Sequence, residues 1–213
     1  MVERVALVTG ASGVLGRAIV ERLRGEGFRV GALDDDGAAG DLAIAADVTD
    51  RSQMVAAAER VTRELGPISV LVTAPHLHDA APFGEMSGER WERLLRMHLG
   101  GTTNACAAVV PDMVRAGRGT VIALSSWLAF AGVAGEAYQA AATGSILAFV
   151  KSFALEVARQ GVRVNCISVG PLDATPPQVA VRPEEIAETV MFLVNDGDHF
   201  VGQVLQAAAA AVV

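Results

Sequence analysis

A glycine-rich turn near the amino terminus constrains the fold of this chain more than any other feature. The apolar run Val5–Thr9 leads into the sequence TGASGVLG, in which two residues separate each glycine from the next, and a helical pattern follows. Such a turn lets the backbone approach a pyrophosphate, and the free N–H groups of the following helix bind anions. Its place at the start of a βαβ unit predicts nucleotide binding, although a turn kept only for helix–strand packing is the alternative. The candidate cofactor-binding residues here are Gly10, Ser12, Gly13, Val14, Leu15 and Gly16.

Short apolar runs rich in valine and isoleucine recur along the whole chain, separated by longer helical patterns. The predicted strands are Val5–Thr9, Arg29–Asp34, 43–47, 70–73, 120–125, 163–167 and 203–206. Continuous apolar strands between helices are typical of a parallel sheet that is covered on both faces. We therefore expect an α/β fold, a Rossmann-type doubly wound seven-stranded parallel sheet, in a single domain that spans residues 1–213.

Helical patterns fill most of the connections between these strands. The predicted helices are residues 16–25, 52–65, 87–99, 138–160 and 183–194. The fourth of these is rich in small side chains, which suit either a helix-pair dimer interface or tight packing on the sheet. Residues 36–47 leave little room for a crossover helix, and residues 171–183 are too few for a lid that covers a substrate.

Composition excludes several classes of partner. The formal net charge of −7 argues against nucleic acid, and no uninterrupted apolar run reaches the roughly 18 residues of a membrane span. No secretory signal precedes the first strand, and Cys106 and Cys166 read as buried thiols, so we expect a cytoplasmic protein. We predict no metal site, because His76 and His78 have no cysteine, and no carboxylate beyond Asp79, at ligand spacing.

Acidic residues end the second and third predicted strands. A carboxylate at Asp34 can accept hydrogen bonds from the ribose hydroxyls of adenosine and would repel a 2′-phosphate, and Asp35 and Asp36 add to that repulsion. Asp47 and Val48 follow the third strand, where they can meet the adenine. These positions predict NAD(H) in preference to NADP(H), and a solvated acidic turn is the alternative interpretation.

Segments along nearly the whole chain resemble the short-chain dehydrogenase/reductase family. They are TGASGVLG, AADVTD, PFGEMSGERWERLLRMHLGG, GTVIALSS, Tyr138 on a long helix, GVRVNCIS and RPEEIAE. The resemblance implies a nicotinamide cofactor and hydride exchange with a small carbonyl or hydroxy substrate. It also implies a homodimer or homotetramer.

The catalytic residues that the resemblance implies are only partly present. The family's serine corresponds to Ser126, or to Ser125 because the distance to the tyrosine leaves one residue of ambiguity, and its tyrosine corresponds to Tyr138. The lysine expected four residues after the tyrosine is Ala142. Lys151, the only lysine of the chain, lies thirteen residues beyond Tyr138, about 20 Å along a helix.

Further departures from the family pattern fall around the cofactor. The family's asparagine on the preceding helix is His98, and its Asn-Asn-Ala-Gly after the fourth strand is Thr73-Ala74-Pro75-His76. Thr73 remains a cofactor-binding candidate. A histidine side chain in place of the glycine would obstruct the backbone's approach to the cofactor.

Three functions are compatible with this sequence. The first is an NAD(H)-linked oxidoreductase with weak or altered activity, in which Tyr138 still donates a proton because a phenol is protonated at neutral pH. The second is a catalytically silent subunit that forms a hetero-oligomer with an active relative. The third is a non-redox dehydratase, isomerase or cyclase that uses His98, Ser126 and Tyr138, since an imidazole acts as acid or base near neutral pH; a structural His98 bonded to backbone is the alternative.

Overall fold

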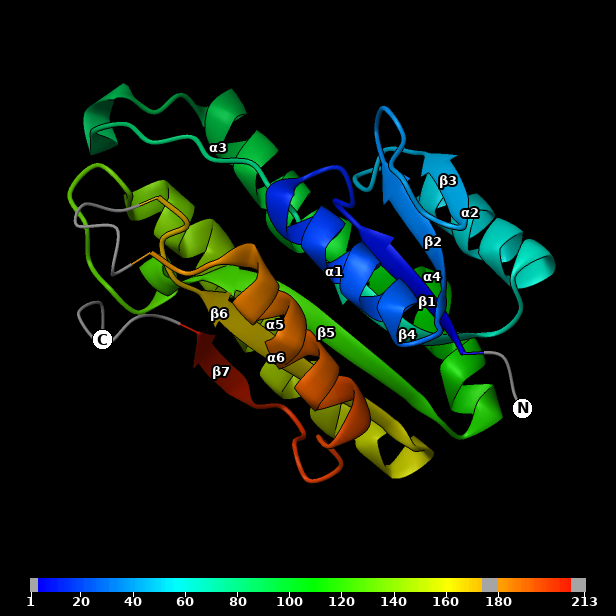
Figure 1. The fold of residues 1–213 in the computed structure, drawn as a ribbon. Coiled ribbons are helices and arrows are strands. Elements are labelled where there is room, and N and C mark those ends of the chain that lie inside the picture. The colour runs from blue at the N-terminus through cyan, green and yellow to red at the C-terminus, as the bar shows by residue number, and fades with distance from the viewer. Residues whose placement is uncertain (1–3, 174–179, 208–213) are drawn as a thin grey trace.

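The computed structural model describes residues 4–173 and 180–207 of this 213-residue chain. Within them, seven parallel strands form one sheet in the order β3-β2-β1-β4-β5-β6-β7 (Figure 1). The predicted Rossmann-type doubly wound parallel sheet is therefore confirmed. The strands are β1 (Val5–Thr9), β2 (Arg29–Asp34), β3 (Leu42–Ala45), β4 (Ile68–Thr73), β5 (Gly119–Ser126), β6 (Val162–Val169) and β7 (Val204–Ala207).

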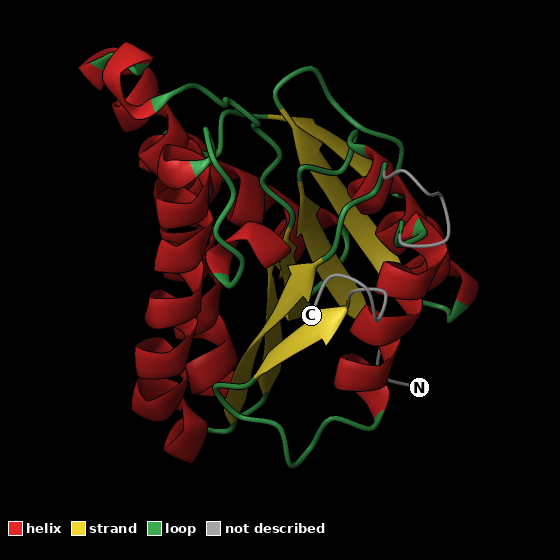
Figure 2. Ribbon diagram, turned by 90° about the vertical axis from the view of Figure 1, so that its left-hand side faces the viewer, coloured by secondary structure: helices red, strands yellow, loops and turns green. Residues whose placement is uncertain are grey.

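Helices cover both faces of the sheet (Figure 2). One face carries α1 (Val14–Gly25) and α6 (Pro183–Asn195), and the other carries α2 (Arg51–Glu64), α4 (Gly101–Ala116) and α5 (Ala137–Val157). Two clusters of buried apolar side chains fill the space between the layers. Successive side chains of a strand enter opposite clusters, as Leu7 and Val8 of β1 do, because strand side chains alternate between faces.

The helix that precedes β5 is longer than the sequence predicts. The predicted helix 87–99 is observed as α3 (Gly88–Leu95), which continues through the π-helical turn η2 (Arg96–Gly100) into α4. Ending the helix at residue 99 was therefore wrong. Gly101 does not interrupt it but lets it approach the segment that follows β3, because a Cβ at Gly101 would lie only 2.9 Å from Val48 Cγ2.

The connection between β2 and β3 contains no helix, as predicted. Asp41 fastens it to β2: the N–H of Val30 donates to Asp41 Oδ2 at 2.8 Å, and the N–H of Asp41 donates to Val30 O at 2.9 Å. Without a crossover helix, the carboxyl end of β2 stays accessible. Part of the predicted short lid, residues 174–179, lies outside the described residues.

Helix α5, extended by the 3₁₀ turn η4 (Ala158–Gln160), is long and apolar enough to cross a membrane by length and composition. Here it packs on β5 and β6, and Ile146, Val150 and Ala154 are fully buried in that contact. Apolar core helices of this kind meet the same criterion. The composition of α5 is thus explained by its place in a layer on the sheet.

Candidate nucleotide site and reaction centre

The glycine turn after β1 has the strand–turn–helix context that the sequence predicts. Gly10 adopts a φ of +67°, and a Cβ there would lie 2.0 Å from the carbonyl oxygen of Ala74, so only glycine fits. Gly13 is the N-cap of α1 and provides no side-chain cap for the free N–H groups of the first turn. Those groups remain available to an anion, which is the property a nucleotide phosphate requires.

Asp34, at the end of β2, is fixed by the glycine turn. Its Oδ2 accepts hydrogen bonds from the N–H and the hydroxyl of Ser12, at 2.8 and 2.6 Å, and its Oδ1 accepts from the N–H of Asp35 at 3.0 Å. Burial alone would raise the pKa of Asp34, but the bonds from Ser12 and Asp35 outweigh it and lower the pKa below its ordinary value. Asp34 is therefore ionised at neutral pH.

An ionised carboxylate offers about four lone-pair positions, of which Ser12 and Asp35 occupy three. Asp34 thus keeps the capacity to accept about one ligand hydroxyl. Ser12 contributes to the site chiefly by orienting this carboxylate, a function that the glycine spacing alone does not reveal.

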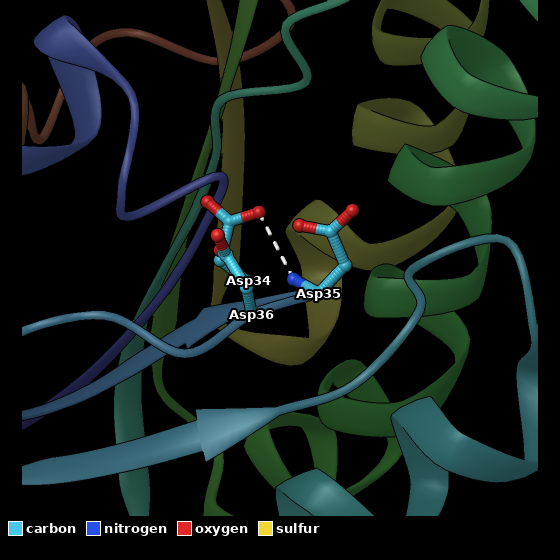
Figure 3. A group of neighbouring side chains, drawn as sticks. All are labelled: Asp34, Asp35 and Asp36. Atoms are coloured by element: carbon cyan, nitrogen blue, oxygen red, sulfur yellow. Dashed lines mark hydrogen bonds between the residues drawn. The ribbon is translucent and has the colours of Figure 1, made fainter.

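Three consecutive aspartates, beginning with the last residue of β2, lie at the carboxyl end of this strand. Carboxylate oxygens of Asp34, Asp35 and Asp36 lie within 4.8 Å of one another, and the last two residues are exposed (Figure 3). Exposed acidic groups often gather in this way without an ion, and Asp34 is already bonded to Ser12. The cluster does concentrate negative charge beside the ribose position, which disfavours a further phosphate there.

A cavity of about 530 Å³ opens beside the glycine turn, at the carboxyl ends of the strands, where doubly wound sheets bind their ligands. Its lining includes Gly10, Asp34, Asp47 and Val48 from the strand ends, together with Pro75, His76, Leu77, Arg93, Arg96, Met97 and Thr102. The cavity lining therefore includes four of the ten predicted nucleotide contacts, and the remaining residues of the glycine turn are not part of it. Thr73 is not among the lining residues; its buried hydroxyl lies 3.4 Å from that of Thr102.

The predicted catalytic residues do not converge on this cavity. Tyr138 lies at the start of α5, where its hydroxyl donates to the carbonyl of Phe83 at 3.2 Å. Its ring stacks on that of Phe83 at a centroid distance of 5.3 Å and contacts Trp91 at 5.4 Å. Ser126 ends β5, and its hydroxyl accepts a hydrogen bond from the N–H of Leu128 in the 3₁₀ turn η3 (Trp127–Ala129).

Gln139, not Tyr138, is the residue of α5 that meets His98. Gln139 is only 4% exposed, and its Nε2 lies 3.2 Å from His98 Nε2. Both nitrogens lie within hydrogen-bond distance of the carbonyl of Leu77, at 3.0 and 2.8 Å, so His98 Nε2 carries its proton and the two side chains donate to one acceptor. Burial lowers the pKa of His98, which keeps the ring neutral.

Thr143 follows Gln139 at the spacing of four residues that the resemblance implies between tyrosine and lysine. Thr143 is buried, and its hydroxyl donates to the carbonyl of Gln139 at 2.9 Å, while its own carbonyl accepts from the hydroxyl of Ser125. Sequence reasoning missed Gln139 and Thr143. The sequence held one signal for them, the one-residue ambiguity in the position of the serine. If the family's serine is Ser126 and not Ser125, the same spacing leads to Gln139 on α5 and not to Tyr138.

Residues 75–81, here called the inner segment, follow β4 and contact the glycine turn at one end and α5 at the other. At one end, a Cβ on Gly13 would lie 3.6 Å from the ring of His76, so the imidazole lies against the turn. At the other end, the N–H of Asp79 donates to Gln139 Oε1 at 3.3 Å, and the Asp79 carboxylate pairs with both guanidinium nitrogens that Arg90 presents. His78 adds a contact with Glu136 at 3.0 Å.

These contacts decide how much of a nicotinamide dinucleotide the site fits. The adenosine half is matched by the glycine turn, the ionised Asp34 and the cavity. The reacting half is not matched: His76 lies against the turn, and Gln139 and His98 direct their amide and imidazole at the inner segment.

Comparison with known proteins identifies relatives of this chain. The family model for short chain dehydrogenase matches residues 4–186. The chain is 29% identical to the 3-oxoacyl-acyl-carrier-protein reductase of Chlamydia trachomatis, with 96% of each chain covered. It is 32% identical to the D-threitol dehydrogenase of Mycolicibacterium smegmatis, with 91% of this chain and 86% of that protein covered.

A solved structure agrees with these relatives. The ligand-free aldohexose dehydrogenase of Thermoplasma acidophilum superimposes with a TM-score of 0.88 at 25% identity, over 96% of this chain and 92% of that one. The chain therefore belongs to the short-chain dehydrogenase/reductase family.

Proposed function

We propose that this chain is a cytoplasmic NAD(H)-binding protein whose oxidoreduction of a small carbonyl or hydroxy compound is weak or altered. The observation that carries the proposal is the contrast within one site. Asp34 and the glycine turn keep the geometry for an adenosine, whereas Gln139 occupies the position on α5 that faces His98. The fold supports binding, and the reaction centre lacks the acid that turnover requires.

The choice of NAD(H) over NADP(H) follows from charge. Asp34 is ionised and surrounded by Asp35 and Asp36, so a 2′-phosphate would meet three carboxylates. No arginine neighbours them closely enough to form an ion pair within the described residues. Two unit charges 4 Å apart repel by about 4 kcal/mol in a surface environment, which is enough to select against the phosphate.

The weak activity follows from the lack of a group placed to transfer a proton to or from the substrate oxygen. A bound NAD(H) would exchange a hydride with the substrate's carbonyl carbon, and the protein must then supply or accept a proton at the oxygen. The amide of Gln139 cannot do this, and the hydroxyl of Tyr138 is directed at Phe83. Losing one electrostatic partner of a reacting oxygen typically costs about 10²–10³ in rate, so we expect turnover at least that far below an intact relative.

Calorimetric titration with NADH and NADPH tests the binding. We expect NADH to bind more tightly than NADPH in the wild type, and Asp34→Ala to reduce that preference. Ser12→Ala should weaken NADH binding less, since it leaves the carboxylate and its backbone bonds and removes only the hydrogen bond from the Ser12 hydroxyl. Equal affinities in the wild type, or a preference that survives Asp34→Ala, would contradict the proposal.

A catalytically silent subunit is the second candidate. It is favoured by His98 and Gln139, which both donate to the carbonyl of Leu77. It is also favoured by Leu155, an apolar residue on α5 that is 76% exposed. In this case α5 would pair with an active relative, whereas the first candidate forms a homodimer or homotetramer. Isolation from the native cell under mild conditions separates the two: a stable complex with a second short-chain dehydrogenase supports the silent subunit, and a homo-oligomer with turnover excludes it.

The non-redox alternative, a dehydratase, isomerase or cyclase, would need a free acid or base. His98 Nε2 is engaged with Leu77, and Tyr138 does not reach it, so no specific contact favours this chemistry. The alternative fails if His98→Ala and Tyr138→Phe leave such an activity unchanged.

A further inference from the structure

The inner segment separates the cavity from the reaction centre. Its residues 75–77 form part of the cavity wall, whereas Gln139 is not among the lining residues. On the other side of the segment, the carbonyl of Leu77 accepts from His98 Nε2 and Gln139 Nε2, at 2.8 and 3.0 Å. A ligand that fills the cavity therefore meets the inner segment before it meets the reaction centre.

The inner segment has no regular structure of its own. All of residues 75–81 are described, and none of them belongs to a helix or a strand. The amides of Asp79 and Ala81 donate to Gln139 Oε1 and to the carbonyl of Gly135, at 3.3 and 3.0 Å, and both acceptors lie outside the segment. A segment held by few such bonds opens locally at a low cost in free energy, so the side chains that fasten it decide how often it opens.

Arg90 fastens this segment from α3. Ser87 caps α3 by accepting from the N–H of Arg90 at 3.3 Å, which places Arg90 in the first turn. Its Nε donates to Asp79 Oδ2 at 2.9 Å and its Nη2 donates to Asp79 Oδ1, so the ion pair is bidentate. These bonds lower the pKa of Asp79 below its ordinary value, with further attraction from Arg93 and His78, and the carboxylate stays ionised at neutral pH.

The closed inner segment would exclude the reacting half of a dinucleotide. A Cβ on Gly13 would lie 3.6 Å from the ring of His76, so the segment closes directly against the turn that would hold the pyrophosphate. The nicotinamide lies beyond the pyrophosphate in NAD(H), and the closed segment stands between it and Gln139. The adenosine end can then bind while the reacting end stays outside the reaction centre.

We propose that Arg90 is a positioning residue that controls access to the reaction centre: its ion pair with Asp79 keeps the inner segment closed, and release of the pair admits the nicotinamide half of NAD(H). The proposal rests on the nucleotide site of the proposed function and adds a contact on α3 that regulates it. Gln139 and His98 hold the segment through neutral groups, whereas charge-assisted bonds are about twice as strong. Loss of the ion pair should therefore have the larger effect on opening.

Calorimetric titration with NADH and with ADP-ribose, which is NADH without its nicotinamide ring, tests the closure. In the wild type we expect the two affinities to agree within about threefold, because the nicotinamide gains no contact. In Asp79→Asn and in Arg90→Gln we expect NADH to gain at least about threefold over ADP-ribose, whose own affinity should stay within about twofold. The swap Asp79→Arg/Arg90→Asp restores the ion pair and should restore the wild-type ratio.

Arg60→Gln is the matched control. It removes the ion pair between Arg60 and Glu64 on α2, in which the arginine side chain is 44% exposed, against 41% for Arg90. Its ratio of NADH to ADP-ribose affinity should equal that of the wild type. Thermal melting checks that each variant folds.

Hydrogen exchange measures the opening of the inner segment without any ligand. In Arg90→Gln the amides of Asp79 and Ala81 should exchange at least about threefold faster than in the wild type, because the segment opens more often. The amides of β4 should keep their wild-type rates, and so should every amide of the inner segment in Arg60→Gln. Unchanged exchange in Arg90→Gln overturns the proposal and leaves NAD(H) binding intact.

The titrations separate this inference from the proposed function. The closure is overturned, with NAD(H) binding intact, if the wild type already prefers NADH by more than about threefold or if the two single variants leave the ratio unchanged. A swap that keeps the ratio of the single variants overturns the role of the ion pair. Failure of both NADH and ADP-ribose to bind the folded wild type overturns the proposed function and, with it, the control of NAD(H) access.

Discussion

Replacing Gln139 by leucine tests whether this residue fastens the inner segment to α5. Leucine has a similar size but cannot form hydrogen bonds. The side chain of Gln139 is 4% exposed, donates to the carbonyl of Leu77 and accepts from the N–H of Asp79. In the variant the Leu77 carbonyl keeps its bond from His98, whereas the N–H of Asp79 loses its acceptor.

An unsatisfied, partly buried backbone group costs about 1–3 kcal/mol, and we expect the free energy of unfolding of Gln139→Leu to fall by that amount. For a chain of this length each kcal/mol corresponds to about 2–4 °C in melting temperature. Urea unfolding followed by tryptophan fluorescence measures the change, with Tyr138→Phe as the neighbouring control. That control loses one hydrogen bond on a partly exposed residue, so its change should stay below about 1 kcal/mol. Surface substitutions usually change the free energy of unfolding by no more than about 0.5 kcal/mol. A loss in Gln139→Leu that stays below this value would refute the reasoning.

Three further predictions concern the turn, the thiols and His98. Gly10→Ala should destabilise the protein by at least about 2 kcal/mol in a urea titration, because its Cβ would collide with the carbonyl of Ala74; wild-type stability would show that the turn can move. Burial raises the pKa of the Cys106 and Cys166 thiols to about 12, so iodoacetamide at pH 8 should modify them only after unfolding, and rapid labelling of the folded protein would contradict their burial. Because burial lowers the folded pKa of His98, the unfolded chain binds the proton first, and stability should decline as the pH falls below about 6.5, by at most about 1.4 kcal/mol per pH unit. In His98→Gln this decline should be smaller, and an unchanged pH dependence would refute the assignment.

The sheet could be predicted from the sequence because each strand carries a continuous apolar signal. Strands β1 and β2 begin and end at the predicted residues, and the others differ by a few residues at their ends. The helix α4 was missed because Gly100 and Gly101 look like a helix end, whereas Gly101 serves the close approach to Val48. That approach depends on a residue distant in sequence, which local periodicity does not contain.

The reaction centre could be predicted only in part. Sequence identified His98 as a departure from the family and singled out His76, whose ring lies against the glycine turn. That His76 obstructs a cofactor stays a prediction. Sequence did not identify Gln139, because a helix turns by about 100° per residue and one residue in the preceding loop decides which side chain faces inward. Tyr138 therefore matched the family by type, while the packing of α5 directs Gln139 at His98. The catalytic assignment of Tyr138 and Ser126 stays a prediction.

From the contacts of Gln139 with His98 and of Thr143 with Ser125, we propose that Gln139 and Thr143 occupy the positions of the family's tyrosine and lysine. The most direct test is carbonyl-dependent oxidation of NADH under single-turnover conditions. We predict that Tyr138→Phe leaves the rate of the wild type unchanged and that Gln139→Tyr/Thr143→Lys raises it by about 10²-fold or more. A large loss of rate in Tyr138→Phe, with no gain in the double variant, would contradict the account and return Tyr138 to the reaction centre.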